Sequence, residues 1–340
     1  MRGQRMTTRL LVVTLLFGLL VSVPLAGAPA AARQDEQLQI VFSVVGLNFP
    51  FFVHMVNIAE EKAAELDIEL IVQDGQDDSA TQSANLEAAI AQGVDGVVIS
   101  PKDVQALAPA IQAVLDAGIP VVTVDRAVEG VETLGHVGAD NVRGGEKQGE
   151  YLLEILPEGG NIIELQGSVG ASAAIDRSAG FNSVIADRPE YEIVFQQTAD
   201  FGRDMGLTVT EQALQANPDA DVIVAANDDM ALGAAEAVAG AGLDIPIIGF
   251  DALPEALQAI QDGTLEATID QWPGQQTSGA MELLVNYLRD GTEPAEHTTL
   301  LEPGLITADN LSEAERAEEA GIEPTGAGAT PEAAEATPAA

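Results

Sequence analysis

The chain has 340 residues, a formal net charge of −40 and no cysteine. Because such a polyanion repels phosphate backbones, the charge excludes nucleic acid as a partner, and it argues against an anionic ligand unless local arginines reverse the field. A chain of this length can build its core without disulfides. Without a cysteine it offers no attachment point for a lipid anchor, so we expect that it is not a lipoprotein.

The first 32 residues are predicted to form a signal peptide that is cleaved after Ala32. Three arginines precede a long apolar run, and small residues follow it. These parts are Arg2, Arg5 and Arg9, then LLVVTLLFGLLVSVPL, then GAPAAA. The apolar run is short for a membrane span, so an uncleaved anchor is the less favoured alternative. We therefore expect a periplasmic protein that is not membrane-embedded after leader cleavage.

From Gln39 onward, short β-branched runs alternate with stretches whose apolar residues recur at helical spacing. The expected strands are QIVFSVVG, IELIVQDG, GVVISP, IPVVTVDR, NIIELQG, EIVFQQTAD, DVIVAAND, IPIIGFD and LEATIDQ. The helices expected between them include HMVNIAEEKAAELD, SANLEAAIAQG, ALAPAIQAVLDAG and DDMALGAAEAVAGAG. This alternation predicts an α/β fold of parallel sheets with helices on both faces.

The sequence contains a rough twofold echo. The pair GVVISP and IPVVTVDR in the first half resembles the pair DVIVAAND and IPIIGFD in the second half. The chain also exceeds what one hydrophobic core comfortably holds. We therefore expect two similar α/β lobes, with a break near residues 138–140.

The last part of the chain differs in composition. From Glu313 onward it consists mainly of Ala, Glu, Pro, Gly and Thr, with almost nothing to bury. Residues 313–340 are therefore predicted to be an acidic disordered tail, with a short helix over SEAERAEEAG as an alternative.

Polar and aromatic residues follow most of the expected strands. In open parallel sheets, ligands bind at the carboxyl ends of the strands. Carboxylates and amides offer planar acceptors and donors, arginine offers a rigid fork, and aromatic rings offer apolar faces. A neutral monosaccharide needs all three, because its hydroxyls both donate and accept while its C–H face is apolar. The candidate ligand-binding residues are Asn48, Phe49, Phe51, Phe52, Ser100, Asp125, Arg126, Phe201, Asn227, Asp251 and Gln271, with Arg177 on a helix.

Several of these residues also have simpler interpretations. Phe51 and Phe52 open a helix and could belong to the core alone. Asp125 beside Arg126 could be a surface ion pair, which contributes little to stability. Asn227 could cap the alanine-rich helix that follows it. The prediction of a site therefore depends on the coincidence of strand-end positions in both halves, and not on any single residue.

A set of short motifs occurs in a familiar order between Gln39 and Thr307. The motifs are LNFPFF, VTVDR, ELQGSVGASAAIDRSAGF, ADF, AANDDMALGA, IGFD and ATIDQ. In these motifs the chain resembles the ribose-binding-like sugar-binding components of ABC importers, which are type 1 periplasmic binding proteins. The resemblance implies two flavodoxin-like lobes, each a parallel sheet with helices on both faces, joined by a three-strand hinge. It covers nearly all of the globular part, and excludes the leader and the tail.

The resemblance also implies a domain division and a mechanism. The first lobe would hold residues 33–138 and 273–301, and the second would hold residues 139–272 and 302–312. Open lobes would close around one sugar and deliver it to an ABC permease. Phe51 and Phe52 match stacking rings of the family, and Asp125 and Arg126 match a polar pair of the first lobe. The ligands of the second lobe and hinge are matched by Arg177, Phe201, Asn227, Asp251 and Gln271.

Two positions depart from the ribose-binding pattern. Phe49 stands beside Pro-Phe-Phe where ribose binders usually carry Asn, with Asn48 one place earlier, and Ser100 replaces an Asn after the third strand. One ring is gained and two amides are lost. The expected ligand is therefore a neutral monosaccharide, either a ribose-like pentose or a hexose, and a polyol such as inositol or another small polyhydroxylated metabolite remains an alternative.

Other functions are weighed against this interpretation. A glycosidase could use paired carboxylates, but no local catalytic motif supports an enzyme, and we predict no catalytic site, metal or cofactor. Lactose-repressor-type regulators share the fold, but here an export leader takes the place of their DNA-binding segment. The closed form could also be presented to a chemoreceptor or sensor kinase. We expect a monomer.

Overall fold

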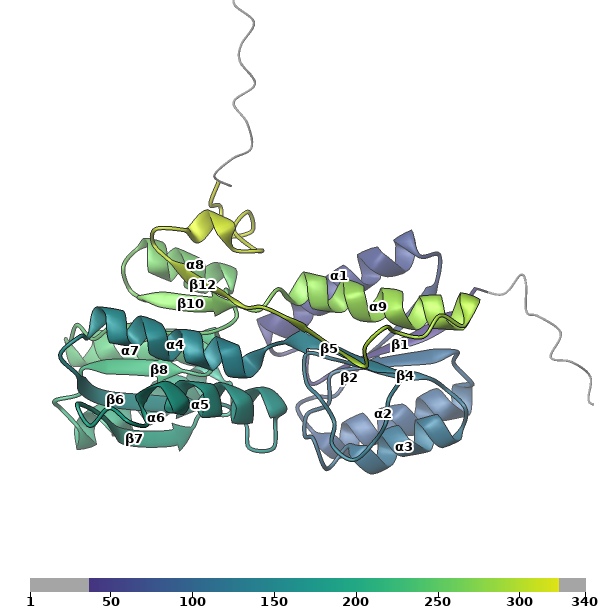
Figure 1. Ribbon diagram of the computed structural model, residues 1–340, viewed down its shortest axis with the longest axis horizontal. Helices are drawn as coiled ribbons and strands as arrows, with labels where there is room; N and C mark the ends of the chain where they lie inside the picture. The colour runs from purple at the N-terminus through teal and green to yellow at the C-terminus, as the bar shows by residue number, and fades with distance from the viewer. Residues whose placement is uncertain (1–36, 324–340) are drawn as a thin grey trace, which may run out of the picture. The chain divides into compact units, whose positions relative to one another are not determined.

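The computed structural model describes residues 37–323, which form two six-stranded sheets with helices around them (Figure 1). The strands of the first sheet are β1 (Gln39–Val44), β2 (Glu69–Asp74), β3 (Gly96–Ile99), β4 (Val121–Val124), β5 (Gly135–Ala139) and β11 (Thr298–Leu301). The strands of the second are β6 (Gly160–Gln166), β7 (Tyr191–Thr198), β8 (Val222–Ala225), β9 (Ile247–Ile248), β10 (Ala267–Asp270) and β12 (Gly304–Thr307). We call the parts built on these sheets lobe 1 and lobe 2.

The helices alternate with the strands along the chain. They are α1 (Pro50–Glu65), α2 (Ser79–Gln92), α3 (Ala108–Asp116), α4 (Asn141–Ile155), α5 (Ser172–Ile185), α6 (Arg203–Ala216), α7 (Asp228–Ala241), α8 (Pro254–Gln261) and α9 (Pro273–Asp290), with a 3₁₀ turn at Leu311–Glu313. Local signals in the sequence explain several ends. Pro50 occupies the first turn of α1, where its missing N–H costs nothing. Asp78 caps α2 by accepting from the Thr81 amide, and Gly93 ends it in the left-handed conformation.

The two sheets have the same strand order. The first has the order β11-β5-β4-β3-β1-β2 and the second β12-β10-β9-β8-β6-β7, so that within each the first five strands follow the flavodoxin-like order 2-1-3-4-5. Every pair in the first sheet is parallel, and in the second only β10 and β12 are antiparallel. The similarity between the two halves of the sequence thus reflects the same strand order in the two sheets. The predicted α/β fold is confirmed.

Helices cover both faces of each sheet. In lobe 1, α1 packs beside α9, and α2 packs beside α3 on the other face (Figure 1). In lobe 2, α4 packs on α5 and α6 packs on α7. The central strands β1, β3, β4 and β8 are almost completely buried, as the apolar runs in the sequence predict.

The chain passes between the two sheets three times. It leaves lobe 1 after β5, returns after β10 into α9, and crosses again between β11 and β12. The nine strands expected from the sequence correspond to β1–β4 and β6–β10. The strands that were not expected one by one, β5, β11 and β12, all flank these passages.

Residues 311–323 correct the prediction of a disordered tail starting at Glu313. Ala314, Ala317 and Ala320 are buried and join the hydrophobic core. Polar contacts hold the same segment, because the Glu315 amide donates to Asp270 Oδ2 at 2.7 Å and the Glu315 carboxylate accepts from the Gly274 amide at 2.7 Å. Alanines at spacing three pack closely although each buries little, so composition alone misses them. The suggested short helix is replaced by the 3₁₀ turn and a run of turns, and residues 324–340 lie outside the described residues.

We expect Ala317→Asp to lower the free energy of unfolding by about 3 kcal/mol, because it buries a carboxylate without a partner. Glu318→Asp is the matched control. It places an aspartate at the next position in the chain, where the side chain is exposed. Urea unfolding of both variants tests the difference. If Ala317→Asp unfolds at the urea concentration of the control, the segment does not pack on the core.

The predicted leader, residues 1–32, also lies outside the described residues. Among residues 37–323, no helix combines the length and apolar character needed to cross a membrane.

Candidate functional site

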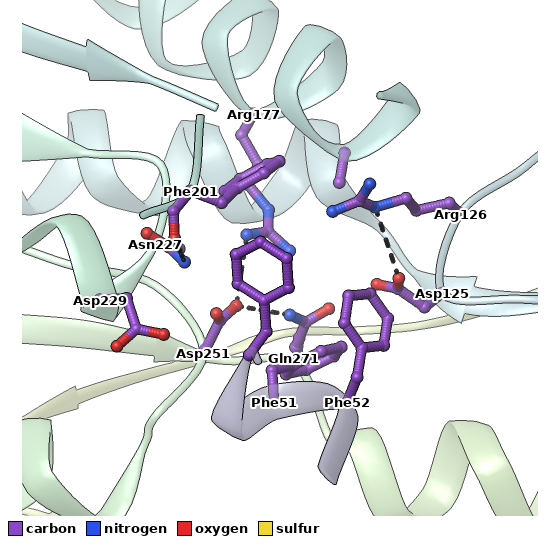
Figure 2. Close-up of a pocket in the computed structure, with 12 residues that line it drawn as sticks. Phe51, Phe52, Asp125, Arg126, Arg177, Phe201, Asn227, Asp229, Asp251 and Gln271 are labelled. Atoms are coloured by element: carbon purple, nitrogen blue, oxygen red, sulfur yellow. Dashed lines mark hydrogen bonds and ion pairs between the residues drawn. The ribbon is translucent and has the colours of Figure 1, made fainter. Parts of the chain in front are cut away.

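A cavity lies between the carboxyl ends of the two sheets, and both lobes contribute to its wall (Figure 2). Two hydrogen bonds join the lobes close to it: the Val104 amide donates to the Gly170 carbonyl, and the Ala127 amide donates to Ser172 Oγ, both at 3.0 Å. The cavity is lined by Phe49, Phe51, Phe52, Asp125, Arg126, Ala173, Arg177, Phe201, Asn227, Asp229, Asp251 and Gln271.

Three aromatic rings stand at the start of α1, where β1 delivers the chain to the cavity. Phe52 packs edge-to-face against both neighbours, with ring centroids 6.2 Å from Phe49 and 5.2 Å from Phe51. Phe51 and Phe52 are buried and also belong to the hydrophobic core. Both rings therefore belong to the core and also line the cavity, and their role in ligand binding stays a prediction.

Asp125 and Arg126 follow β4 and form a buried pair. Asp125 Oδ2 accepts from Ser100 Oγ at 2.7 Å and lies 3.8 Å from Arg126 Nε. The Arg126 guanidinium sits between two rings, 5.5 Å from the centroid of Phe52 and 5.1 Å from that of Phe201. The surface ion-pair interpretation is wrong, because both side chains are more than nine-tenths buried. Arg126 instead links the aromatic walls of the two lobes.

Arg177, on α5, holds the wall contributed by lobe 2. Its Nε donates to Asn141 Oδ1 at 2.8 Å, and its Nη1 donates to the Ala226 carbonyl at 2.7 Å and to Asp251 Oδ1 at 3.3 Å. The guanidinium also stacks on Phe250, 3.6 Å from the ring centroid. These contacts hold the Arg177 guanidinium in one orientation, which is therefore set before a ligand binds.

The backbone at three strand ends is bent into the left-handed region. Asp125 and Phe201 have φ of 60°, and Asp251 has φ of 117°. Such conformations cost non-glycine residues about 1–3 kcal/mol each and persist where the surrounding structure enforces them. Here they turn side chains out of the strand direction and into the cavity.

The carboxylates of the cavity share one feature. Asp125 uses Oδ2 and Asp251 uses Oδ1 for protein contacts, the latter accepting from Gln271 Nε2 at 2.6 Å as well as from Arg177. Within residues 37–323, no protein group donates to the other oxygen of either side chain. Over the same residues, Nη2 of Arg126 and Nη2 of Arg177 have no protein acceptor. The cavity wall thus offers carboxylate oxygens that can accept and guanidinium nitrogens that can donate hydrogen bonds.

Burial dominates the titration of these groups. It raises the pKa of Asp251 to about 7, while the charge of Arg177 works in the opposite direction. Burial likewise raises the pKa of Asp125, with Arg126 and Ser100 opposing it. Both carboxylates are therefore held in a low-dielectric environment, where hydrogen bonds to the ionised form are strong.

Two predicted site residues do not line the cavity. Asn48 is exposed in the turn before α1. Ser100 is fully buried behind Asp125, to which it donates, so it supports the wall instead of forming it. Asn227 caps α7 by accepting from the Met230 amide at 3.0 Å, which confirms the cap interpretation. It also lines the cavity, and its role as a ligand-binding residue stays a prediction.

Two lining residues were missed by the sequence analysis, Ala173 and Asp229. Ala173 lies four residues before Arg177 on α5, and that helical spacing could have placed it on the same face. Asp229 follows Asn227 and Asp228 in the first turn of α7. No periodicity distinguishes the two aspartates, so only the structure shows which of them faces the cavity.

Comparison with known proteins places this architecture. A model described as the periplasmic binding protein domain matches residues 40–293. The ribose import binding protein RbsB of Bacillus subtilis (strain 168) is 42% identical over 247 residues, which cover 72% of this chain and 80% of that protein. The galactofuranose-binding protein YtfQ of Escherichia coli (strain K12) is 33% identical over 306 residues, covering 87% of this chain and 96% of that protein.

Solved structures give the same result. The Caulobacter myo-inositol binding protein bound to myo-inositol superposes with a TM-score of 0.81 at 40% identity, covering 84% of this chain and 98% of that chain. A galactofuranose binding protein gives a TM-score of 0.80 at 32% identity. With a matched domain over most of its length and relatives well above 30% identity, this chain belongs to the family of periplasmic binding proteins.

Proposed function

We propose that this protein captures a neutral monosaccharide between its two lobes and delivers it to an ABC import permease. The observation that carries the proposal is the cavity wall, in which acceptor oxygens of Asp125 and Asp251 stand beside donor nitrogens of Arg126 and Arg177. A hydroxyl both donates and accepts, so a polyhydroxylated ligand satisfies such a mixed set. The phenylalanines supply apolar surface for the C–H face of a sugar ring.

The charges of the wall support a neutral ligand. Its arginines, Arg126 and Arg177, already face the carboxylates of Asp125 and Asp251. An anionic ligand would have to compete with these carboxylates for the same guanidinium groups. The relatives named above for ribose, galactofuranose and myo-inositol make a pentose, a hexose and a cyclitol the ligand classes to compare.

The proposed mechanism is a shift between open and closed arrangements of the lobes. The lobes comprise residues 33–138 with 273–301 and residues 139–272 with 302–312, and the three passages between the sheets act as the hinge. A ligand that contacts both walls binds the closed arrangement more tightly and so increases its population. In this mechanism, closure would form the hydrogen bond in which the Val104 amide donates to the Gly170 carbonyl.

The proposed partners follow from this mechanism. The permease recognises the surface that closure creates, and a chemoreceptor or sensor kinase could use the same surface. We propose that the leader is cleaved, that the mature protein is a periplasmic monomer without a lipid anchor, and that it acts without a cofactor or catalysis.

A thermal-shift screen of the protein without its leader tests the proposal. A ligand that binds only the folded state raises the melting temperature, by an amount equivalent to about 4 kcal/mol when the ligand is present at a thousand times its Kd. We expect at least one neutral pentose, hexose or cyclitol to raise it, and sugar phosphates and uronic acids to have no effect. A shift with the anionic ligands alone, or with none of the panel, would overturn the neutral-sugar assignment.

A further inference from the structure

Asp229 is a third carboxylate in the cavity wall. It lies in the first turn of α7, is 7% exposed and lines the cavity. Figure 2 shows it at the end of the cavity opposite Asp125 and Arg126, with Asp251 between the two ends. The cavity therefore has carboxylates that can accept hydrogen bonds at both ends and between them, and not only beside Arg126.

The adjacent Asp228 shows by contrast what a purely structural carboxylate looks like here. Asp228 is completely buried, and each of its oxygens has a protein donor: Oδ1 accepts from Thr268 Oγ1 at 2.7 Å, and Oδ2 accepts from the Leu253 amide at 2.8 Å. Its bonds tie α7 to the chain around β10 and α8. Nothing is left on Asp228 for a ligand.

Asp229 is arranged differently. Its Oδ1 lies 3.3 Å from Arg203 Nη2, and no group within residues 37–323 donates to its Oδ2. Arg203 is itself held by Glu255 through two hydrogen bonds of 2.7 Å each. Asp229 thus repeats the pattern of Asp125 and Asp251, in which one oxygen is fixed by the protein while the other is left for a different donor.

We propose that Asp229 is a specificity-determining residue, whose Oδ2 accepts a hydrogen bond from a ligand hydroxyl at the end of the cavity remote from Asp125. The inference rests on the proposed function and names the ligand class more narrowly. In its pyranose form, a pentose lacks the hydroxymethyl group that the corresponding hexose carries. Because the hydroxyl of that group would donate to Asp229 Oδ2, Asp229 favours a sugar with six carbons. Leaving this carboxylate oxygen without a donor in the closed, desolvated site penalises the shorter sugar.

Matched sugar pairs make the proposal testable. D-allose and D-ribose, D-glucose and D-xylose, and D-galactose and L-arabinose differ, in their pyranose forms, by a single hydroxymethyl group. Isothermal titration gives the Kd of each sugar for the wild-type protein and for Asp229→Asn and Asp229→Ala. Asp204→Asn, on the exposed first turn of α6, removes one carboxylate of the same lobe outside the cavity and serves as the matched control.

We expect the wild-type protein to bind the hexose of its preferred pair about tenfold or more tighter than the pentose. Asp229→Asn should remove most of that ratio, chiefly by weakening the hexose, while Asp204→Asn leaves it unchanged. A melting curve of each variant tests whether a loss of binding is a loss of folding. The ratio of the hexose Kd to the pentose Kd is measured on one folded variant, so it does not depend on how much of that variant is folded.

The possible failures are distinguishable. A wild-type protein that binds sugars but prefers pentoses, or an Asp229→Asn variant that keeps the wild-type ratio, overturns the role of Asp229 and leaves the proposed function standing. A wild-type protein that binds none of the six sugars and no cyclitol overturns both.

Discussion

Asp125→Ala is expected to weaken binding of the preferred sugar by a factor of about 100 or more, while the protein keeps its fold. A hydrogen bond to a charged, buried acceptor contributes about 1.5–3 kcal/mol, and the substitution also removes the counter-charge of Arg126. The fold should tolerate the change because burial raises the pKa of Asp125, which means that the ionised side chain is itself costly to bury. Isothermal titration measures the loss, and circular dichroism with a melting curve measures the fold.

Ser100→Ala is the graded control for this prediction. Ser100 donates to Asp125 Oδ2 from behind the wall and does not line the cavity, so its loss should weaken binding severalfold without abolishing it. If Asp125→Ala binds the sugar as tightly as the wild type, Asp125 does not belong to the site. An equal and complete loss in both variants would point instead to a collapse of the wall after β4.

The sequence predicts the strand-end residues of the site because their positions follow from chain order. Asp125 after β4 and Asp251 after β9 stand where parallel sheets present their ligands, and recognising the strands was enough to place them. The rings at the start of α1 could be placed in the same way. The alternation of short apolar runs and amphipathic stretches likewise defined most of the two sheets.

The rest depends on contacts that have no local signature. Which of Asp228 and Asp229 faces the cavity is decided by Thr268 and the Leu253 amide, which satisfy one of them from distant parts of the chain. Ser100 followed its strand as expected, yet Asp125 lies between it and the cavity. A strand-end position therefore predicts nearness to the site, whereas the direction of a side chain requires the backbone angles.

The unexpected strands were missed for a related reason. β5, Gly135–Ala139, contains two glycines and a buried histidine instead of an apolar run, and β11 is mostly exposed. Their pairing is set by their place beside the passages between the lobes, and strand propensity is a weak guide where that context decides.

The second large effect is expected from Gly180→Ala, at the contact between α4 and α5. A Cβ at residue 180 would lie 2.0 Å from the Val142 carbonyl oxygen and 3.0 Å from the Glu146 amide nitrogen, and both are backbone atoms that cannot rotate away. The contact is reciprocal, because a Cβ on Gly145 would lie 2.1 Å from the Arg177 carbonyl oxygen. We expect the free energy of unfolding to fall by about 2–4 kcal/mol, measured by urea unfolding.

The same substitution should weaken sugar binding without touching the cavity wall, because separating the helices moves Arg177, whose own carbonyl lies in the contact. Gly240→Ala provides the matched control: residue 240 also lies within a helix, α7, but apart from its chain neighbours and the backbone of that helix no atom lies within 4 Å of the added Cβ. Since alanine is the better helix former, that variant should be as stable as the wild type or more stable by about 0.5–1 kcal/mol. Equal stability of the two variants would mean that α4 and α5 do not approach as closely as described. If Gly180→Ala is destabilised but keeps full affinity for the sugar, the position of Arg177 does not depend on the contact between α4 and α5.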